Sequence, residues 1–365
     1  MRKCPYCDFN SHEARGEVRE SVYVDALIND LDAALPNIWG RPVQTIFFGG
    51  GTPSLFSAAS LDRLLSEVRA RVPLAPAAEI TLEANPGTFE AEKFAAYRKL
   101  GINRLSIGIQ SFNPTHLKAL GRIHDDDEAR RAVAIARDNF DNFNLDLMYA
   151  LPQQTLAEAL ADIDQAVSLG APHISAYHLT LEPNTLFYKY PPPLPDHDAS
   201  AAMQEAIENK LQTAGYDHYE TSAFAKPGRP CKHNLNYWQF GDYLGIGAGA
   251  HSKLSFRERI VREMRYKHPE TYLQKVKSGA AVQEHRVIGV ADLPFEFMMN
   301  ALRLTDGVAR AIFSERTGLP ISVVAKILTR AEDKQLIARD HRHLAPTQKG
   351  QRFLNDLLEM FLPDE

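Results

Sequence analysis

Two cysteines, Cys4 and Cys7, stand three positions apart near the start of the chain, within the stretch Cys-Pro-Tyr-Cys-Asp-Phe. A Cys-x-x-Cys pair places two soft sulfur ligands on one tight turn, and this arrangement serves zinc sites, redox disulfides and iron–sulfur clusters. The pair alone leaves these chemistries open. A lone pair of this kind also fits half of a zinc knuckle or an inert terminal turn.

A glycine loop downstream narrows the choice. The apolar run Ile46–Phe48 leads into Gly49, Gly50 and Gly51, which are followed by Thr52 and Pro53. Glycines allow the backbone to approach a ligand closely. The loop lacks the Lys and Ser/Thr of a phosphate-binding P-loop, so nucleoside triphosphate binding is not expected. The two stretches together predict a metal cluster beside a small-molecule site.

Several polar side chains stand at the ends of apolar, strand-like runs: Glu83, Gln110, Asp146 and Thr180. In a (β/α) barrel the active site lies at the C-terminal ends of the strands, and several strands each contribute one group. Periodicity alone does not distinguish such a barrel from an open doubly wound sheet, because both bury parallel strands on two faces. The repeated polar strand ends favour the barrel.

The elements that would position these residues alternate along the chain. Strand-like runs begin near Thr45, Glu79, Arg104, Asn144 and His173, a recurrence that fits βα units of a parallel sheet. Helical periodicity separates them, with one apolar face over residues 24–35 and another over 61–72. Thr155 followed by Glu158 predicts a capping box that opens a further helix.

Composition limits the function classes. The chain has 365 residues, 44% of them hydrophobic, and a net charge of −5, so no basic field gathers nucleic acid. No apolar run reaches the ~18 residues that span a bilayer, although peripheral membrane contact stays compatible with the sequence. Three cysteines do not build a disulfide framework, and we expect a reducing, cytoplasmic location.

Five motifs follow one another in an order that resembles the radical S-adenosylmethionine (SAM) enzymes: Cys4–Phe9, Gly49–Pro53, Leu82–Pro86, Gly108–Ser111 and Asp146–Tyr149. Within that superfamily the chain is similar to the HemW-type heme chaperones, relatives of the oxygen-independent coproporphyrinogen III oxidases. The resemblance implies an α/β fold, an incomplete (β/α)6 TIM-like barrel whose first strand is missing here, with a small helical, winged-helix-like C-terminal domain.

One departure concerns the cluster. The family motif is Cys-x-x-x-Cys-x-x-Cys, in which three cysteines hold a [4Fe-4S] cluster and SAM chelates the fourth iron. Cys4 and Cys7 match the second and third ligands, and the first would fall immediately before Met1. We therefore expect an N-terminally truncated or mis-assigned start, with one cluster ligand missing from this chain. A cluster-free scaffold is the alternative.

The resemblance implies roles for the remaining site residues around SAM. Tyr6 would pack near the adenine, Gly49, Gly50, Gly51 and Thr52 would contact the methionine end, and Glu83 would engage the amino or ribose groups. Gln110, Arg122 and Asp146 would lie around the carboxylate and ribose, with Thr180 and Ile246 completing the site. Without the family, Arg122 is a solvated helix-end cation and Asp146 a structural acid inside a barrel layer. No catalytic side chain is assigned.

A second motif, Cys231–Trp238, contains His-Asn-x-x-Tyr-Trp and resembles the heme-associated signature of the chaperone family. His233 is then the candidate heme-iron ligand, and Tyr237 and Trp238 provide an apolar wall for a flat macrocycle. A turn whose aromatic residues cover the barrel mouth is the alternative. Residues 243–252 form a glycine-rich run after an expected strand, with the wrong spacing for dinucleotide binding.

We expect three parts: a partial barrel over 1–225, a covering segment with the His233 motif over 226–290, and the winged-helix-like domain over 291–365. Its elements would be helices over 293–302, 323–336 and 351–361, with a β-wing over 337–344. The resemblance implies a chaperone that binds heme, SAM and a [4Fe-4S] cluster and passes heme to a recipient protein. An oxygen-independent coproporphyrinogen III oxidase is the alternative. Those oxidases carry a further cysteine where this chain has Phe9.

Overall fold

The computed structural model describes residues 4–12, 19–122 and 125–363. They divide into two compact units, which are described separately. The first contains residues up to 218 and 222–230, and the second contains 219–221 and 231–363. Within these described ranges, no helix combines the length and the apolar character that crossing a bilayer requires.

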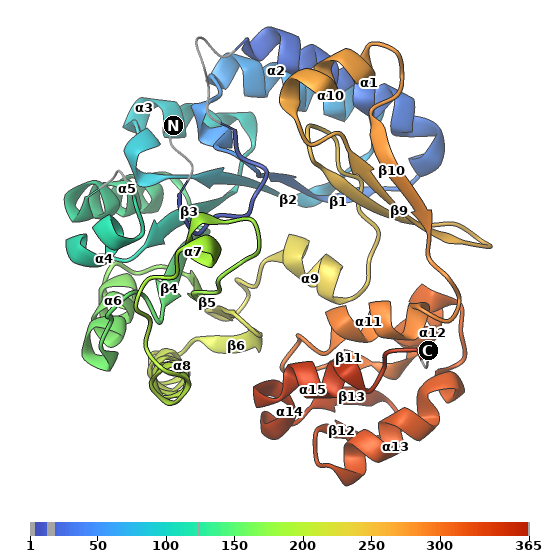
Figure 1. Cartoon of the computed structure of the whole chain (residues 1–365). Helices are drawn as coiled ribbons and strands as arrows, with labels where there is room; N and C mark the ends of the chain where they lie inside the picture. Colours follow the sequence, from blue (N-terminus) through green and yellow to red (C-terminus); the bar gives the residue numbers. More distant parts are fainter. Residues whose placement is uncertain (1–3, 13–18, 123–124, 364–365) are drawn as a thin grey trace. The chain divides into compact units, whose positions relative to one another are not determined.

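The first unit is built on a seven-stranded sheet that curls into part of a barrel (Figure 1), in the order β1-β2-β3-β4-β5-β7-β6. Neighbouring strands from β1 to β5 are parallel, and β7 runs antiparallel to β5. The strands are β1 (Val43–Phe48), β2 (Leu74–Ala84), β3 (Arg104–Gln110), β4 (Phe143–Tyr149), β5 (His173–His178), β6 (Asp217–Glu220) and β7 (Ala223–Ala225). Strands that follow one another without a reversal of order wind as in a barrel, whereas a doubly wound sheet has a switch point.

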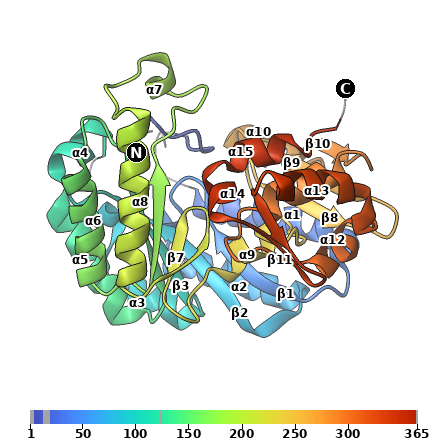
Figure 2. The ribbon, with the colours of Figure 1, turned by 90° about the horizontal axis from the view of Figure 1, so that it is seen from below.

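The helices of this unit connect successive strands. They are α1 (Glu20–Ile38), α2 (Ala58–Arg71), α3 (Ala91–Leu100), α4 (Pro114–Ala119), α5 (Asp126–Asn139), α6 (Leu156–Ser168), α7 (Leu186–Lys189) and α8 (His197–Thr213), with short 3-10 turns η1 (Pro53–Leu55) and η2 (Pro86–Thr88). Figure 2 shows α4, α5, α6 and α8 along one side of the sheet. The predicted capping box is present, because Thr155 and Glu158 bond reciprocally at the start of α6.

The two faces of the sheet differ in chemistry. The helix-covered face carries the apolar core, with Ile80, Leu105, Leu145 and Ile174 among its members. The register places the alternate residues of the same strands on the other, concave face, where Glu83 pairs with Ser106, Ser106 with Asn144, and Asn144 with His173. Because side chains alternate along a strand, the polar set lies together on the inside of the curl.

The second unit begins with α9 (Lys232–Trp238), followed by the antiparallel sheet β10-β9-β8. Its strands are β8 (His251–Ser255), β9 (Ile260–Arg265) and β10 (Val282–Val287), and α10 (Pro269–Val276) connects β9 to β10. A strand was expected before the glycine-rich run 243–252. That is wrong, because the helix α9 precedes the run and β8 begins at its end.

The C-terminal part of this unit packs short helices on a three-stranded sheet, β11-β13-β12. Its elements are α11 (Leu293–Ala301), β11 (Val308–Ala309), α12 (Arg310–Thr317), η3 (Ile321–Val324), α13 (Ala325–Asp333), β12 (Ile337–Arg339), β13 (His343–Pro346), α14 (Gln348–Arg352) and α15 (Leu354–Glu359). The expected helices over 293–302 and 323–336 and the β-wing are present. The last expected helix is divided at Phe353. The expected three-part domain division stays a prediction.

Candidate cofactor and heme sites

The cysteine loop is held against the mouth of the half-barrel by α7. The amide of Cys7 donates to the carbonyl of Cys4 (3.2 Å), and the amide of Phe187 donates to the carbonyl of Pro5 (3.0 Å). The ring centroids of Tyr6 and Phe187 are 6.4 Å apart. Burial raises the pKa of Tyr6, and the Arg122 guanidinium opposes the rise. The loop thus presents two half-buried cysteine side chains from one turn.

Arg122 joins this loop to two strands. Its Nη1 donates to Asn85 Oδ1 (3.0 Å), its Nη2 donates to the carbonyl of Gly108 (3.1 Å), and Nη1 lies 4.0 Å from Cys4 Sγ. These contacts rule out the alternative that Arg122 is merely a solvated cation at the end of a helix.

The glycine loop meets the first acidic group of the site. The amide of Gly50 donates to Glu83 Oε2 (3.1 Å), and Asn85 Nδ2 donates weakly to Thr52 Oγ1 (3.4 Å). Residues 83 and 85 extend from the end of β2, two positions apart and therefore on the same side. Asn85 was not identified from the sequence as a site residue. The alternation Glu-x-Asn after an apolar strand is the signal that could have shown it.

Two carboxylates at this mouth, Glu83 and Asp146, lie close enough for the charge of Asp146 to act on Glu83. Burial, with the charge of Asp146 added, raises the pKa of Glu83 to about 7, and the Gly50 amide opposes the rise. Burial also raises the pKa of Asp146, against the donors Ser106 and Asn144 and the nearby Arg104 and Arg122 charges. Carboxylates whose charge is this poorly compensated are suited to a ligand that brings positive charge or hydrogen-bond donors.

Gln110 closes β3 with a positive φ of 69°, just after a register shift between Gly108 and Gln110. The space around Gly108 is narrow, because a Cβ there would lie 3.0 Å from both Arg122 Nη2 and Gln110 Nε2. A non-glycine residue at positive φ is uncommon and marks a functional or strained position. The structure therefore brings Gln110, Arg122 and Asn85 around one backbone position.

Thr180 lies beyond the end of β5 and is exposed, with its hydroxyl donating to the carbonyl of His178 (3.3 Å). No contact of Thr180 with the other candidate residues is observed within the described part of the chain. The structure thus brings together the cysteine loop, the glycine loop, Glu83, Gln110, Arg122 and Asp146, and the role of Thr180 stays a prediction.

The residues at the mouth fit SAM and part of a cluster site. Within residues 4–12, 19–122 and 125–363, no group of three or more histidine, cysteine, aspartate or glutamate side chains is arranged to hold a metal ion. The thiols of Cys4 and Cys7 are suitable ligands for two irons. The glycine amides, the two carboxylates and the guanidinium match the amino, carboxylate and hydroxyl groups of SAM in hydrogen-bonding type.

The His233 motif lies on α9, within the second unit. His233 Nε2 lies 2.9 Å from Tyr237 Oη, and the two rings meet edge to face. Tyr237 also contacts the Tyr243 ring at 4.5 Å between centroids. Because residues four apart share a helix face, His233 and Tyr237 are presented together. The hydroxyl of Tyr237 therefore lies at Nε2 of His233, the candidate iron ligand.

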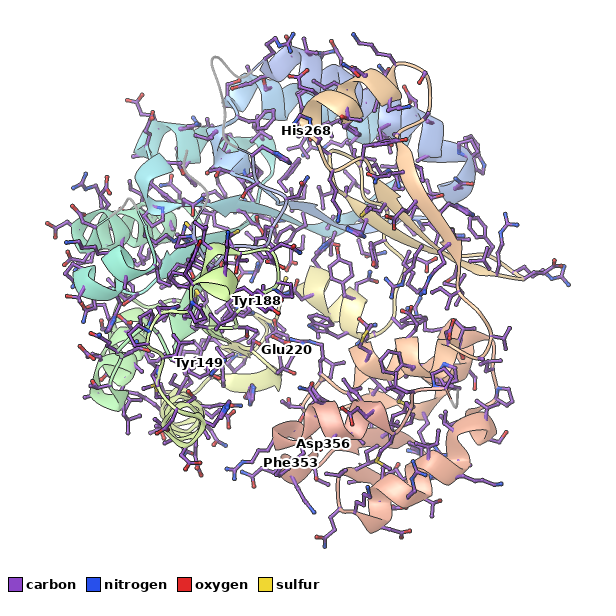
Figure 3. All side chains as sticks on the ribbon, in the orientation of Figure 1. Tyr149, Tyr188, Glu220, His268, Phe353 and Asp356 are labelled. Atoms are coloured by element: carbon purple, nitrogen blue, oxygen red, sulfur yellow. The ribbon has the colours of Figure 1, made fainter. Side chains whose placement is uncertain are left out.

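Trp238 is held from a different direction. The Arg303 guanidinium lies over its ring, 4.3 Å from the centroid, and Arg303 pairs with the buried Glu220 (3.1 Å), labelled in Figure 3. The Trp238 side chain is thus part of a stacked ion-pair arrangement as well as of the expected apolar wall. Ile246 is half-buried in the glycine-rich run. There Gly245 allows a close approach, because a Cβ would lie 2.1 Å from the His251 carbonyl oxygen.

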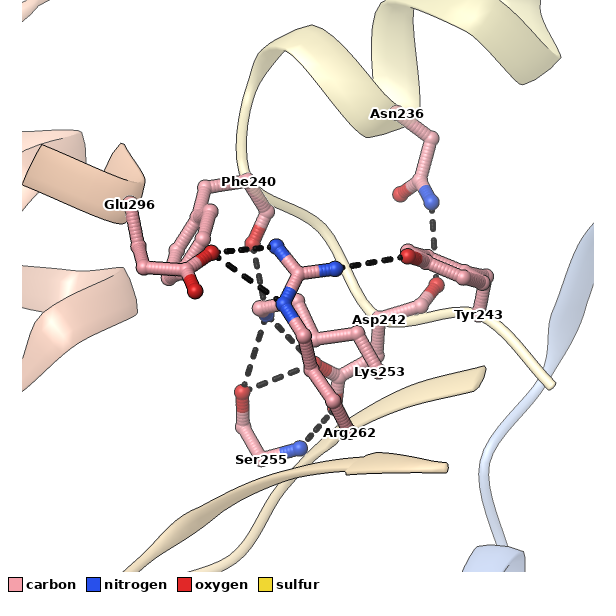
Figure 4. Close-up of polar contacts among 8 residues, drawn as sticks. All are labelled: Asn236, Phe240, Asp242, Tyr243, Lys253, Ser255, Arg262 and Glu296. Atoms are coloured by element: carbon pink, nitrogen blue, oxygen red, sulfur yellow. Dashed lines mark hydrogen bonds and ion pairs between the residues drawn. The ribbon is translucent and has the colours of Figure 1, made fainter. Parts of the chain in front are cut away.

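A buried polar network anchors the loop that follows α9 (Figure 4). The Lys253 ammonium donates to Asp242 (3.0 Å) and to the carbonyl of Phe240 (2.9 Å). Asn236 Nδ2 donates to the carbonyl of Asp242 (2.9 Å), which ties α9 to the same loop. No motif in the sequence indicates this network, because its members carry ordinary polar side chains.

A second arm of the network holds Tyr243. Arg262 donates to Tyr243 Oη (3.0 Å) and twice to Glu296 Oε2 (2.6 and 3.1 Å), and Arg286 donates to the other oxygen of Glu296 (2.6 Å). Tyr243 in turn supports the ring of Tyr237. The aromatic surface beside His233 is therefore set by paired, hydrogen-bonded charges.

Comparisons with known proteins agree with this arrangement. A model of the radical SAM superfamily matches residues 1–166, and one of the HemN C-terminal domain matches residues 290–353. The heme chaperone HemW of Escherichia coli is 50% identical over 366 residues, covering 100% of this chain and 96% of the relative. The heme chaperone HemW of Haemophilus influenzae is 48% identical, with the same coverages.

A solved structure shares the fold. The coproporphyrinogen III oxidase of Escherichia coli, a radical SAM enzyme, superimposes with a TM-score of 0.83 at 22% identity, covering 99% of this chain and 87% of that chain. The expected fold class, a partial radical SAM barrel with an added C-terminal domain, is confirmed.

Proposed function

Because this chain belongs to the HemW family of heme chaperones within the radical SAM superfamily, we propose that it binds heme and transfers it to a recipient protein. SAM and a [4Fe-4S] cluster serve as its further cofactors. The main support for the proposal is the 50% identity to a HemW chaperone over the full length of this chain. The meeting of cysteine loop, glycine loop and strand-end carboxylates at one mouth supports the cofactor part.

In the cofactor site, Cys4 and Cys7 would hold two irons of the cluster. Glu83, which accepts from the Gly50 amide, would orient the amino group of SAM, while Gln110, Arg122 and Asp146 would receive its carboxylate and ribose. Tyr6 would pack near the adenine. Thr180 and Ile246 are proposed contacts on the family resemblance alone. A bound cluster and SAM together supply reductive cleavage of a carbon–sulfur bond, and the protein groups orient SAM and exclude water.

In the heme site, the imidazole of His233 would bind the heme iron. Its Nε2 would leave the Tyr237 hydroxyl to reach the iron. The rings of Tyr237, Trp238 and Tyr243 are steeply inclined to one another, so one of them would lie flat against the macrocycle and the others would offer it their apolar edges. The acidic composition supports a partner other than nucleic acid. We propose a cytoplasmic location, with a heme-receiving protein as partner and at most peripheral contact with membranes.

The alternative activity is coproporphyrinogen oxidation by radical decarboxylation. Phe9, 65% exposed, occupies the position where the resemblance puts a further cysteine in those oxidases. The 22% identity to the solved oxidase supports the shared fold alone. The chaperone is therefore the better-supported function.

The full chain, reconstituted anaerobically with iron and sulfide, tests the proposal by heme titration and by a coproporphyrinogen III decarboxylation assay run in parallel. We expect heme uptake with a shifted Soret band, release to apomyoglobin, and no decarboxylation. His233→Ala should weaken uptake, whereas His268→Ala should not, since His268 is an exposed histidine ahead of α10 (Figure 3). Decarboxylation turnover would overturn the proposal, and absence of cluster absorbance with normal heme uptake would remove its cofactor part.

A further inference from the structure

Beneath the cofactor mouth, the concave face of the sheet carries a closed polar network. Its centre is Asn144, which is 2% exposed and stands on the same rung as Ser106 and His173 of the neighbouring strands. One rung above lie Asp146 and Ser175. All five side chains point to the same side of the sheet because they alternate with the apolar residues of the core.

The Asn144 amide uses its whole hydrogen-bonding capacity. Its Oδ1 lies 2.7 Å from His173 Nδ1 and accepts from Ser175 Oγ (3.0 Å). Its Nδ2 donates to Ser106 Oγ (2.8 Å) and to Asp146 Oδ1 (2.8 Å). Ser106 in turn donates to Asp146 Oδ2 (3.0 Å). Both oxygens of Asp146 are therefore held from below.

The charge of Asp146 determines the direction of these bonds. If the amide were flipped, Asn144 Oδ1 would face a carboxylate oxygen and both would be acceptors. With Nδ2 toward Asp146, Oδ1 faces His173, so the imidazole must donate from Nδ1. Burial lowers the pKa of His173 well below its ordinary value, with Arg104 adding to the effect. It is therefore the neutral tautomer with hydrogen on Nδ1.

From this geometry we infer that Asn144, oriented by His173, is a positioning residue that fixes the Asp146 carboxylate in its ionised form toward the mouth, ready to accept from a hydroxyl or ammonium group of the bound ligand. The inference rests on the proposed SAM site. Asn144 and His173 lie behind Asp146 and need not touch the ligand.

Other charged groups also face Asp146, namely Glu83 from β2, Arg104 from β3 and Arg122 from the segment after α4. Glu83 favours protonation of Asp146, and the two arginines favour ionisation. Asn144 adds a neutral donor to the side of ionisation. Its loss should thus raise the pH at which Asp146 is protonated, and binding of SAM should fail at higher pH than in the unaltered protein.

The decisive variant is Asn144→Asp, which keeps the shape but replaces the donor by an oxygen facing Asp146. SAM affinity of the reconstituted full chain is measured by equilibrium dialysis from acid to alkaline pH, with thermal unfolding in parallel. We expect about a tenfold or greater loss of affinity at neutral pH, with the acid limb of binding moved to higher pH. Ser175→Ala is the matched control, since His173 still orients the amide, and it should change affinity by about twofold or less.

Should Asn144→Asp fail to fold, His173→Leu tests the same relay by removing the orienting donor, and it should move the acid limb in the same direction. An equal loss of affinity at every pH would indicate a purely structural role and overturn the inference. So would unchanged binding in the altered proteins. Absence of SAM binding in the unaltered protein would instead refute the proposed cofactor site, so the two failures are distinguishable.

Discussion

The pKa values of acidic groups in the two units are shifted in opposite directions. At the mouth of the half-barrel, burial raises the pKa of Glu83 to about 7 and also raises that of Asp146. In the network behind α9, burial would raise the pKa of Asp242, but Lys253 and Ser255 hold it below its ordinary value. Burial outweighs the donors and arginines around Asp146, so the mouth acids are left available to a ligand, whereas the acid whose compensation outweighs burial holds a surface in shape.

The largest effect is expected on the free energy of unfolding, where the ion pair that compensates a charge is removed. Lys253→Met leaves Asp242 without its cation in a buried place, since the Lys253 side chain is 1% exposed. We expect a loss of about 3 kcal/mol in the free energy of unfolding, measured by chemical denaturation. Arg63→Met, which removes the exposed Arg63–Asp25 pair, is the control and should cost less than about 1 kcal/mol. Equal costs would contradict the distinction between the two kinds of charge.

Removing a charge at the mouth should weaken ligand binding and should not lower the free energy of unfolding. Glu83→Gln keeps a polar side chain but loses the charge that would attract the SAM ammonium, so affinity should fall about 10- to 100-fold. The unfolding midpoint should stay the same or rise, because a poorly compensated carboxylate is gone. Glu90→Gln, at an exposed position, serves as the control. A lowered midpoint with unchanged SAM affinity would make Glu83 a structural residue.

Tyr237→Phe sharpens the comparison on the heme side. It removes the hydroxyl that holds His233 Nε2 while keeping the aromatic ring. Heme affinity should rise about fivefold, because one hydrogen bond no longer has to be broken. Absorption titration of the full chain measures this. Tyr243→Phe, which removes a hydroxyl bonded to Arg262 and not to His233, should not raise affinity. Weaker binding in Tyr237→Phe would indicate that the hydroxyl itself supports heme.

The smallest effect is a pH dependence of stability. The folded-state pKa of Glu83 lies above its unfolded value, so the folded protein binds the extra proton between about pH 4.5 and 7. Stability from this group is complete below that window and is lost as pH rises through 7. The difference between the unaltered protein and Glu83→Gln should therefore change by about 1 kcal/mol between about pH 6.3 and pH 8. Denaturant melts at both pH values measure it, and a constant difference would contradict the raised pKa.

Local signals carried most of the sequence interpretation of the fold. The expected strand starts at Arg104 and His173 coincide with the observed ones, and the Thr155 capping box was readable because its partner is three residues away. The choice between barrel and open sheet was less direct, since it depends on strand order and not on periodicity. The expected strand before residue 243 failed because α9 is short and rich in aromatic residues.

The motifs name the candidate site residues, but they do not name the neighbours that distant strands bring to those residues. Nothing near Asn144 in the sequence indicates His173, which is 29 residues away and becomes a neighbour only through the β4–β5 register. For Asn85 the local alternation with Glu83 was a usable signal, but its partner Arg122 comes from another element and could not be read from it. Such pairs are set by tertiary geometry, and side-chain type alone carries no record of them.

The division of the sheet into an apolar and a polar face has an evolutionary consequence. Folding energy comes mostly from the helix-covered side, where Leu105, Leu145 and Ile174 pack. Substitutions on the inner side can then alter what the protein recognises at modest cost to its folding. A family of proteins that keeps one scaffold can in this way diversify its chemistry.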